Sequence, residues 1–117
     1  MKGRVLIAED EELLLDMLRA IFEEHGCEVV CFATADAAYD YLQRTGHRLN
    51  LLFTDVKMPG AMTGLDLAYQ ARRLQPDLRI VISSGYFDGP IQQLSRVTLL
   101  AKPWEVDRLL EVCELTG

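Results

Sequence analysis

The chain has 117 residues, half of them hydrophobic and 26% charged, which is the size and balance of one globular domain. Its formal net charge of -6 disfavours nonspecific binding to a nucleic-acid backbone, which needs clustered Lys and Arg. No apolar run approaches the roughly 20 residues of a membrane span, and the amino terminus lacks the apolar core of a signal peptide. We therefore expect one soluble, cytoplasmic domain over residues 1–117, without nucleic-acid or membrane partners.

The cysteines form no recognisable disulfide or zinc motif. Cys27, Cys31 and Cys113 make an odd number and include no CxxC pair. We expect reduced thiols that serve as small apolar side chains, as in proteins of a reducing compartment. His25 and His47 are not spaced to complete a zinc site with them, so no such site is expected.

Short apolar runs alternate with segments of helical periodicity along the chain. In chain order, the predicted elements are a strand at 5–8, a helix at 11–25, a strand at 29–32, a helix at 35–44, a strand at 51–53, a helix at 65–74, a strand at 80–82, a strand at 97–100 and a helix at 103–115. Gly26 is expected to end the first helix, Thr34 to cap the second, and Pro103 to lie in the first turn of the last. Residues 88–96 include Gly89-Pro90 and are expected to form only a short or irregular helix.

Five short strands that alternate with helices predict an α/β fold, in which a parallel sheet is covered by helices on both faces. In such a sheet, ligands bind outside the carboxyl ends of the strands. Polar side chains follow four of the five predicted strands, namely Glu9 and Asp10, Asp55, Ser83, and Lys102. We therefore expect these side chains to converge on one edge of the sheet.

The chemistry of this set is restrictive. Three carboxylates brought together repel one another unless a cation lies among them. Their three negative charges would be balanced by one divalent cation together with the ammonium of Lys102. Oxygen ligands favour Mg²⁺, which also accepts phosphate oxygens. An aspartate carboxylate can accept a phosphoryl group, and Asp55, which stands alone at the end of the third strand, is the natural nucleophile.

Together these motifs resemble those of the receiver domain of two-component response regulators, over essentially the whole chain. The motifs are Glu9-Asp10, the segment 54–60 (TDVKMPG), Gly64, Ser83 and Lys102-Pro103. The resemblance implies a flavodoxin-like, doubly wound fold whose five parallel strands have the order 2-1-3-4-5. It also implies a cis peptide bond between Lys102 and Pro103.

The resemblance assigns a role to each site residue. Asp55 would accept a phosphoryl group from a histidine kinase or a histidine phosphotransfer protein. Ser83 would donate a hydrogen bond to that group, and Lys102 would pair with it. The implied Mg²⁺ ligands are the carboxylates of Glu9, Asp10 and Asp55 and the backbone carbonyl of Lys57. Such a domain assists its own phosphorylation and slow dephosphorylation, and is otherwise not an enzyme.

The sequence departs from the common receiver pattern at several places. Leu99 stands where typical members have an aromatic switch residue, and the segment 83–86 (SSGY) resembles a subgroup that lacks this aromatic. The loop after Asp55 is one residue longer than usual. Our hypothesis is that phosphorylation orders residues 88–96 instead of rotating an aromatic side chain. Trp104 is expected to pack at the start of the last helix.

Other functions remain open. A degenerate receiver would bind a partner without phosphorylation, although Asp55 and Lys102 are intact. Aspartate-based phosphohydrolases use Asp-x-Asp, and Lys57 occupies the second acidic position here. A flavodoxin-like cofactor binder is disfavoured, because the acidic residues 9–12 would repel a phosphate. The domain either acts alone or belongs to a larger protein such as a hybrid histidine kinase, and a homodimer through the fourth helix, fifth strand and fifth helix is common in the family.

Overall fold

The computed structural model of the protein describes residues 3–45, 48–85 and 96–115. In chain order their elements are β1 (Gly3–Ala8), α1 (Glu12–Glu24), β2 (Cys27–Phe32), α2 (Ala35–Thr45), β3 (Leu51–Asp55), α3 (Gly64–Leu74), β4 (Arg79–Ser84), β5 (Val97–Ala101) and α4 (Val106–Val112). Every predicted strand and helix outside 88–96 is present. The expected irregular helix at 88–96, and the hypothesis that phosphorylation orders this segment, fall almost entirely outside the described residues.

The five strands form one sheet in the order β2-β1-β3-β4-β5, and every neighbouring pair is parallel. This is the strand order that the resemblance implied. Because all strands run the same way, their carboxyl ends meet at one edge. In the register of that edge Asp55 lies opposite Ser83, and Ser84 lies opposite Ala101. Among the helices that the structure describes, none is long and apolar enough to cross a membrane.

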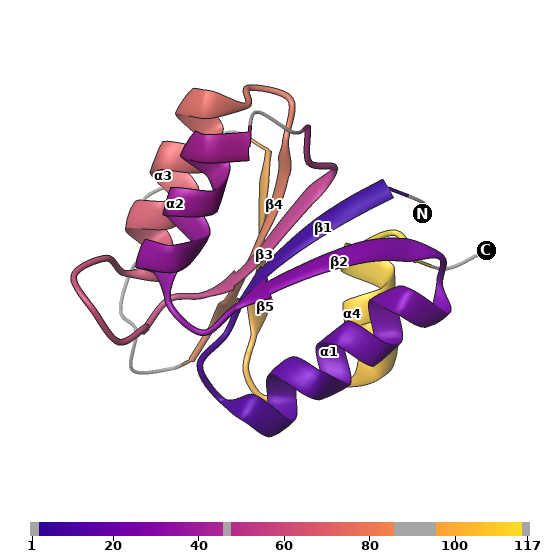
Figure 1. Cartoon of the computed structure of the whole chain (residues 1–117). Helices are drawn as coiled ribbons and strands as arrows, with labels where there is room; N and C mark the ends of the chain where they lie inside the picture. Colours follow the sequence, from indigo (N-terminus) through magenta and orange to yellow (C-terminus); the bar gives the residue numbers. More distant parts are fainter. Residues whose placement is uncertain (1–2, 46–47, 86–95, 116–117) are drawn as a thin grey trace.

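Helices cover both faces of the sheet, α2 and α3 on one side and α1 and α4 on the other (Figure 1). Successive residues of β1 therefore point into different layers: Leu6 packs in the cluster under α2 and α3, and Val5 and Ile7 pack under α1 and α4. All three are fully buried. Burial on both faces is why the strand is a continuous apolar run, since each such side chain contributes about 1.5–3 kcal/mol.

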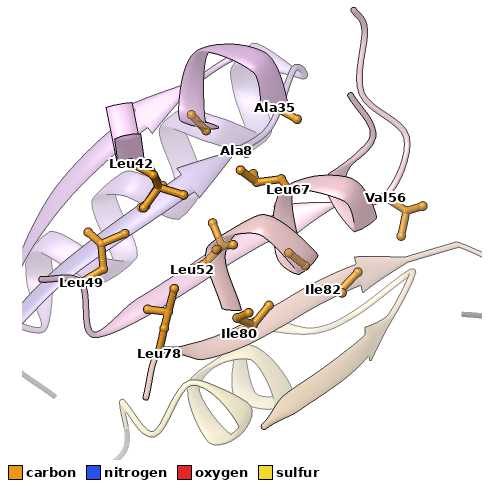
Figure 2. Close-up of a cluster of buried hydrophobic side chains, with 14 residues drawn as sticks. Ala8, Ala35, Leu42, Leu49, Leu52, Val56, Leu67, Leu78, Ile80 and Ile82 are labelled. Carbon is orange, nitrogen blue, oxygen red and sulfur yellow. The ribbon is translucent and has the colours of Figure 1, made fainter. Parts of the chain in front are cut away.

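The layer under α2 and α3 is built from aliphatic side chains alone at its centre. Figure 2 shows Leu52 of β3 and Ile80 of β4 pointing at Leu42 of α2 and Leu67 of α3. All four residues are at most 5% exposed. This packing fixes α2 and α3 against the strands, and so fixes the loops that leave the carboxyl edge.

Two of the predicted helix boundaries are confirmed and one is wrong. The hydroxyl of Thr34 accepts a 3.0 Å hydrogen bond from the backbone of Ala37, and Gly26 follows α1 with φ +84°. The last helix begins at Val106 and not at Pro103, which lies after a cis peptide bond. A proline is tolerated in a first helical turn but does not by itself place a helix start there. Here Glu105, directly before Val106, has an extended backbone.

None of the three cysteines forms a disulfide, and their surroundings differ. Cys27 and Cys113 are buried among apolar side chains, and burial raises the pKa of both, that of Cys113 to about 12. Cys31 is half-buried, and its sulfur accepts a hydrogen bond from Nε of Arg19 at 3.4 Å. The thiolate is the reactive form, so the two buried thiols are protected twice, by burial and by protonation.

We expect iodoacetamide at pH 8 to add one group to the native chain, at Cys31, and three groups after denaturation. The pKa values of Cys27 and Cys113 lie above the working pH, and their sulfurs are covered. Intact mass and peptide mapping measure both numbers. The variant Cys31→Ala is the control and should take up no group while folded. Rapid native labelling of Cys113 would contradict the packing of α4 against the sheet.

Candidate functional site

Three acidic side chains meet at the carboxyl edge of the sheet, as predicted. Glu9 and Asp10 follow β1 directly, and Asp55 is the last residue of the adjacent strand β3. One carboxylate oxygen from each residue lies within 4.8 Å of the others. Glu9 is 1% and Asp55 7% exposed, whereas Asp10 faces solvent. Such a cluster could hold a metal ion, because carboxylate oxygens this close repel one another without a cation.

Glu9 is the member of the cluster that most needs a further partner. Its Oε2 accepts a hydrogen bond from the backbone of Glu11 at 3.0 Å, and its Oε1 is buried without a hydrogen-bond partner among the described residues. Burial raises the pKa of Glu9, the bond from Glu11 opposes this, and the charge of Asp55 adds to it. A cation would both satisfy Oε1 and favour the ionised form, so the residues fit a metal.

Asp55 forms an ion pair with a lysine that follows β5, an edge strand of the sheet. Its Oδ1 accepts the backbone N–H of Val56 at 2.7 Å, and its Oδ2 lies 2.6 Å from Nζ of Lys102. Lys102 directly follows β5. Its backbone N–H donates a 2.8 Å hydrogen bond to the carbonyl of Ser84 at the end of β4. One ammonium facing three carboxylates leaves two negative charges, which matches a divalent cation.

Ser83 lies beside Asp55 in the register of the sheet and is 1% exposed. Its Oγ accepts a 3.2 Å hydrogen bond from Nε1 of Trp104. The indole also meets Phe53 edge to face, with ring centroids 6.4 Å apart. Trp104 packs with the α1 and α4 layer, ahead of the last helix, as expected. The bond between Trp104 and Ser83 was not predicted, because nothing in the sequence spacing indicates a contact between the two.

The start of α3 packs against the end of β3. The N–H of Gly64 donates to the carbonyl of Val56 at 2.8 Å, and a Cβ at Gly64 would lie 1.5 Å from the carbonyl oxygen of Asp55. Thr54 donates its hydroxyl to that same oxygen at 2.9 Å. Gly64 therefore allows the loop between β3 and α3 to return close to the backbone at the end of β3. Lys57 lies in this loop with its side chain exposed, and a metal-binding role for its backbone carbonyl stays a prediction.

The longer loop after Asp55 is anchored by a residue that sequence reasoning missed. Oδ2 of Asp36, in the first turn of α2, accepts the N–H groups of Ala61 and Met62 at 3.1 and 3.5 Å. Gly60 has φ +102°, and a Cβ there would lie 2.2 Å from the same oxygen. Asp36 thus ties the loop to the neighbouring helix. An acidic residue in a first helical turn is common, so its loop contact left no distinct signal in the sequence.

Comparison with known proteins identifies the family. Residues 5–114 match the family model of the response regulator receiver domain. The chain is 31% identical, over 97% of its length, to the transcriptional regulatory protein FixJ of Bradyrhizobium diazoefficiens, and covers 56% of that protein. It is 36% identical, over 71% of its length, to the response regulator receiver protein CpdR of Brucella abortus, of which it covers 67%. The crystal structure of the receiver domain of the hybrid histidine kinase CckA superposes with a TM-score of 0.81 at 26% identity, over 96% of both chains.

The chain therefore belongs to the response regulator receiver domain family. Receiver domains are signalling modules that interact with histidine kinases or phosphotransfer proteins in two-component systems. The chain spans about half the length of FixJ and about two thirds of CpdR. In this chain, acidic side chains, a hydroxyl and a lysine from the ends of four strands converge on one edge of the sheet.

Gly64→Ala is expected to destabilise the chain, by about 1–3 kcal/mol. Helix propensity alone predicts the opposite sign, because alanine is favoured over glycine within a helix by roughly 0.5–1 kcal/mol. The added methyl group, however, would collide with the backbone of Asp55. Urea unfolding measures the sign directly. A more stable Gly64→Ala variant would show that the start of α3 does not pack against the end of β3.

Lys102→Met is expected to lower the free energy of unfolding by about 1–2 kcal/mol in EDTA, a figure reduced for the partial exposure of Lys102. The loss should shrink in an Asp55→Asn background, since the variant carboxamide no longer attracts the ammonium. Arg44→Met, which breaks the exposed pair with Asp40, is the matched control and should cost under about 0.5 kcal/mol. Equal losses in both backgrounds would mean that the 2.6 Å contact carries no electrostatic coupling.

Proposed function

We propose that this chain is a phosphoacceptor of a two-component phosphorelay, in which Asp55 takes a phosphoryl group and thereby switches binding of a downstream protein. The phosphoryl donor would be a phosphohistidine of a histidine kinase or of a histidine phosphotransfer protein. The observation that carries the proposal is the buried carboxylate of Asp55, 2.6 Å from Lys102 and within 4.8 Å of two further carboxylates. A nucleophile in this setting is both oriented and matched with positive charge.

Mg²⁺ is the cofactor that fits the proposal. The donor set is all oxygen, which favours a hard divalent cation. The residues that would hold it are Glu9, Asp10 and Asp55, with the backbone carbonyl of Lys57. When bound, the ion would neutralise charge on the phosphoryl oxygens. Oε1 of Glu9, buried without a hydrogen-bond partner among the described residues, supports its place in this set.

In the proposed transfer, Asp55 forms the new bond, and Lys102 and Ser83 contact the phosphoryl oxygens. A carboxylate oxygen of Asp55 attacks phosphorus, the new O–P bond forms, and the P–N bond to the donor imidazole breaks. The imidazole nitrogen keeps the electron pair and can take up a proton from water. Lys102 then pairs with a phosphoryl oxygen, and Ser83 donates its hydroxyl hydrogen bond to another. Hydrolysis by water later returns the Asp55 carboxylate and inorganic phosphate.

The other candidate functions have less support. A receiver that acts without phosphorylation would have no need for the charge match between Asp55 and Lys102. A phosphohydrolase would need a second acid at the position of Lys57, so we infer a domain that is otherwise not an enzyme.

We also propose that residues 1–117 form one cytoplasmic domain. A homodimer through the predicted fourth helix at 88–96, the fifth strand β5 and the last helix, labelled α4 in the structure, stays a prediction. Of that surface the structure describes β5 and α4, where Leu99 and Val106 are 50% and 43% exposed.

Phosphorylation at Asp55 is tested with phosphoramidate as the donor and intact mass as the readout. We expect one phosphoryl adduct with Mg²⁺ present and none with EDTA. Asp55→Asn should take up none, and Asp10→Asn should need more Mg²⁺ for the same rate, because it removes a ligand and one charge. The emission of Trp104, the single tryptophan, should change on addition of Mg²⁺ and again with the donor. No adduct on Asp55 with saturating Mg²⁺ would sink the proposal and favour an interaction module that works without phosphorylation.

A further inference from the structure

The hydrogen bond from Trp104 to Ser83 joins the functional site to a residue outside it. Trp104 lies between β5 and α4, two residues after Lys102. Its Nε1 lies 3.2 Å from Oγ of Ser83, which is almost wholly buried. Ser83 in turn lies opposite Asp55 in the sheet. Trp104 therefore contacts β4, the strand that neighbours the strand of Asp55.

The indole is held in a fixed orientation. Its ring meets Phe53 edge to face, at a centroid distance of 6.4 Å and an interplanar angle of 80°. Phe53 is fully buried and meets Phe22 of α1 in a second edge contact, also at 6.4 Å. A ring packed in this way cannot turn its N–H freely. The direction of the hydrogen bond to Ser83 is thus set by the apolar layer under α1 and α4.

The chemistry of the two groups determines which atom donates. An indole N–H can only donate a hydrogen bond, whereas a serine hydroxyl can accept one bond and donate another. Ser83 must therefore accept from Trp104, which directs a lone pair of Oγ toward the indole. The hydroxyl proton is left to point elsewhere, and the neighbouring strand position is that of Asp55.

We propose that Trp104 is a positioning residue for phosphoryl transfer, whose indole N–H orients the Ser83 hydroxyl so that its proton is presented to a phosphoryl oxygen on Asp55. The inference rests on the proposed function, because it needs a phosphoryl group at Asp55. It assigns the indole a task that ring packing alone does not require. A phenylalanine could fill the space beside Phe53, but it has no N–H for Ser83.

The rate of phosphorylation by phosphoramidate with Mg²⁺ tests the inference in a double-mutant cycle. Trp104→Phe removes the donor and should slow phosphorylation of Asp55 about 3- to 10-fold, the effect of one neutral hydrogen bond. Ser83→Ala should slow it at least as much, and Trp104→Phe should then add no further loss. Ser83→Thr keeps a hydroxyl and should retain the effect of Trp104→Phe. Tyr41→Phe, which removes a polar group from the aromatic pair Phe32–Tyr41 of another layer, is the control and should leave the rate unchanged.

A second variant separates the N–H from the packing of the ring. Because Trp104 is the single tryptophan, a tryptophan auxotroph grown on benzothienylalanine replaces only this residue, with sulfur in place of the N–H. The ring shape is kept, so the same slowing is expected with an unchanged melting temperature. A wild-type rate in both this protein and Trp104→Phe would overturn the inference. So would an equal slowing by Trp104→Phe with and without the Ser83 hydroxyl.

The indole ¹H–¹⁵N resonance distinguishes failure of the inference from failure of the proposed function. One such signal is expected, and Ser83→Ala should shift it without Mg²⁺ or donor, because it removes the acceptor of the N–H. If the wild-type chain is phosphorylated but the cycle is additive, the inference falls and the phosphoacceptor stands. If Asp55 takes up no phosphoryl group while the resonance still shows the bond, the proposed function fails and takes the positioning role with it.

Discussion

Repulsion among the carboxylates of Glu9, Asp10 and Asp55 is the constraint on which the site depends. The three groups lie within 4.8 Å of one another, two of them buried, and burial raises the pKa of Glu9. Burying these carboxylates so close together lowers the stability of the fold, so stability alone does not explain the cluster. Lys102 balances part of the charge through its 2.6 Å contact with Asp55, and two negative charges remain. In our proposal, this unbalanced charge binds a divalent cation, and the cation in turn holds a phosphoryl group on Asp55.

The rest of the fold keeps these charges in place. A parallel sheet brings the ends of β1, β3, β4 and β5 to one edge, and two apolar layers prevent the strands from separating. Gly64 lets α3 approach the backbone of Asp55, and Asp36 ties the long loop to α2. Trp104 links the buried layer under α1 and α4 to Ser83. Close packing therefore serves the site directly, since a shift of any of these elements would move a polar group at the strand ends.

Much of this arrangement could be predicted from residue patterns. Apolar runs such as 5–8 are typical of strands buried on both faces, and parallel strands necessarily bring Glu9, Asp55 and Lys102 to one edge. Contacts that depend on rotamers could not be predicted: the bond from Trp104 to Ser83 spans 21 residues. The start of α4 was misplaced because proline suits a first helical turn, whereas here the helix begins at Val106, after an extended Glu105. The roles of the site residues in metal binding and phosphoryl transfer, and the ordering of residues 88–96, remain predictions.

The most direct test of the account is a crystal structure of the chain grown with Mg²⁺ and beryllofluoride, a stable substitute for the phosphoryl group. We predict one ion among the carboxylates of Glu9, Asp10 and Asp55, and beryllofluoride on a carboxylate oxygen of Asp55. Lys102 should contact a fluorine atom, and Ser83 should donate to another while still accepting from Trp104. An ion bound elsewhere, or an Asp55 without beryllofluoride at saturating concentrations, would contradict the claim that this carboxylate cluster is built to receive a phosphoryl group.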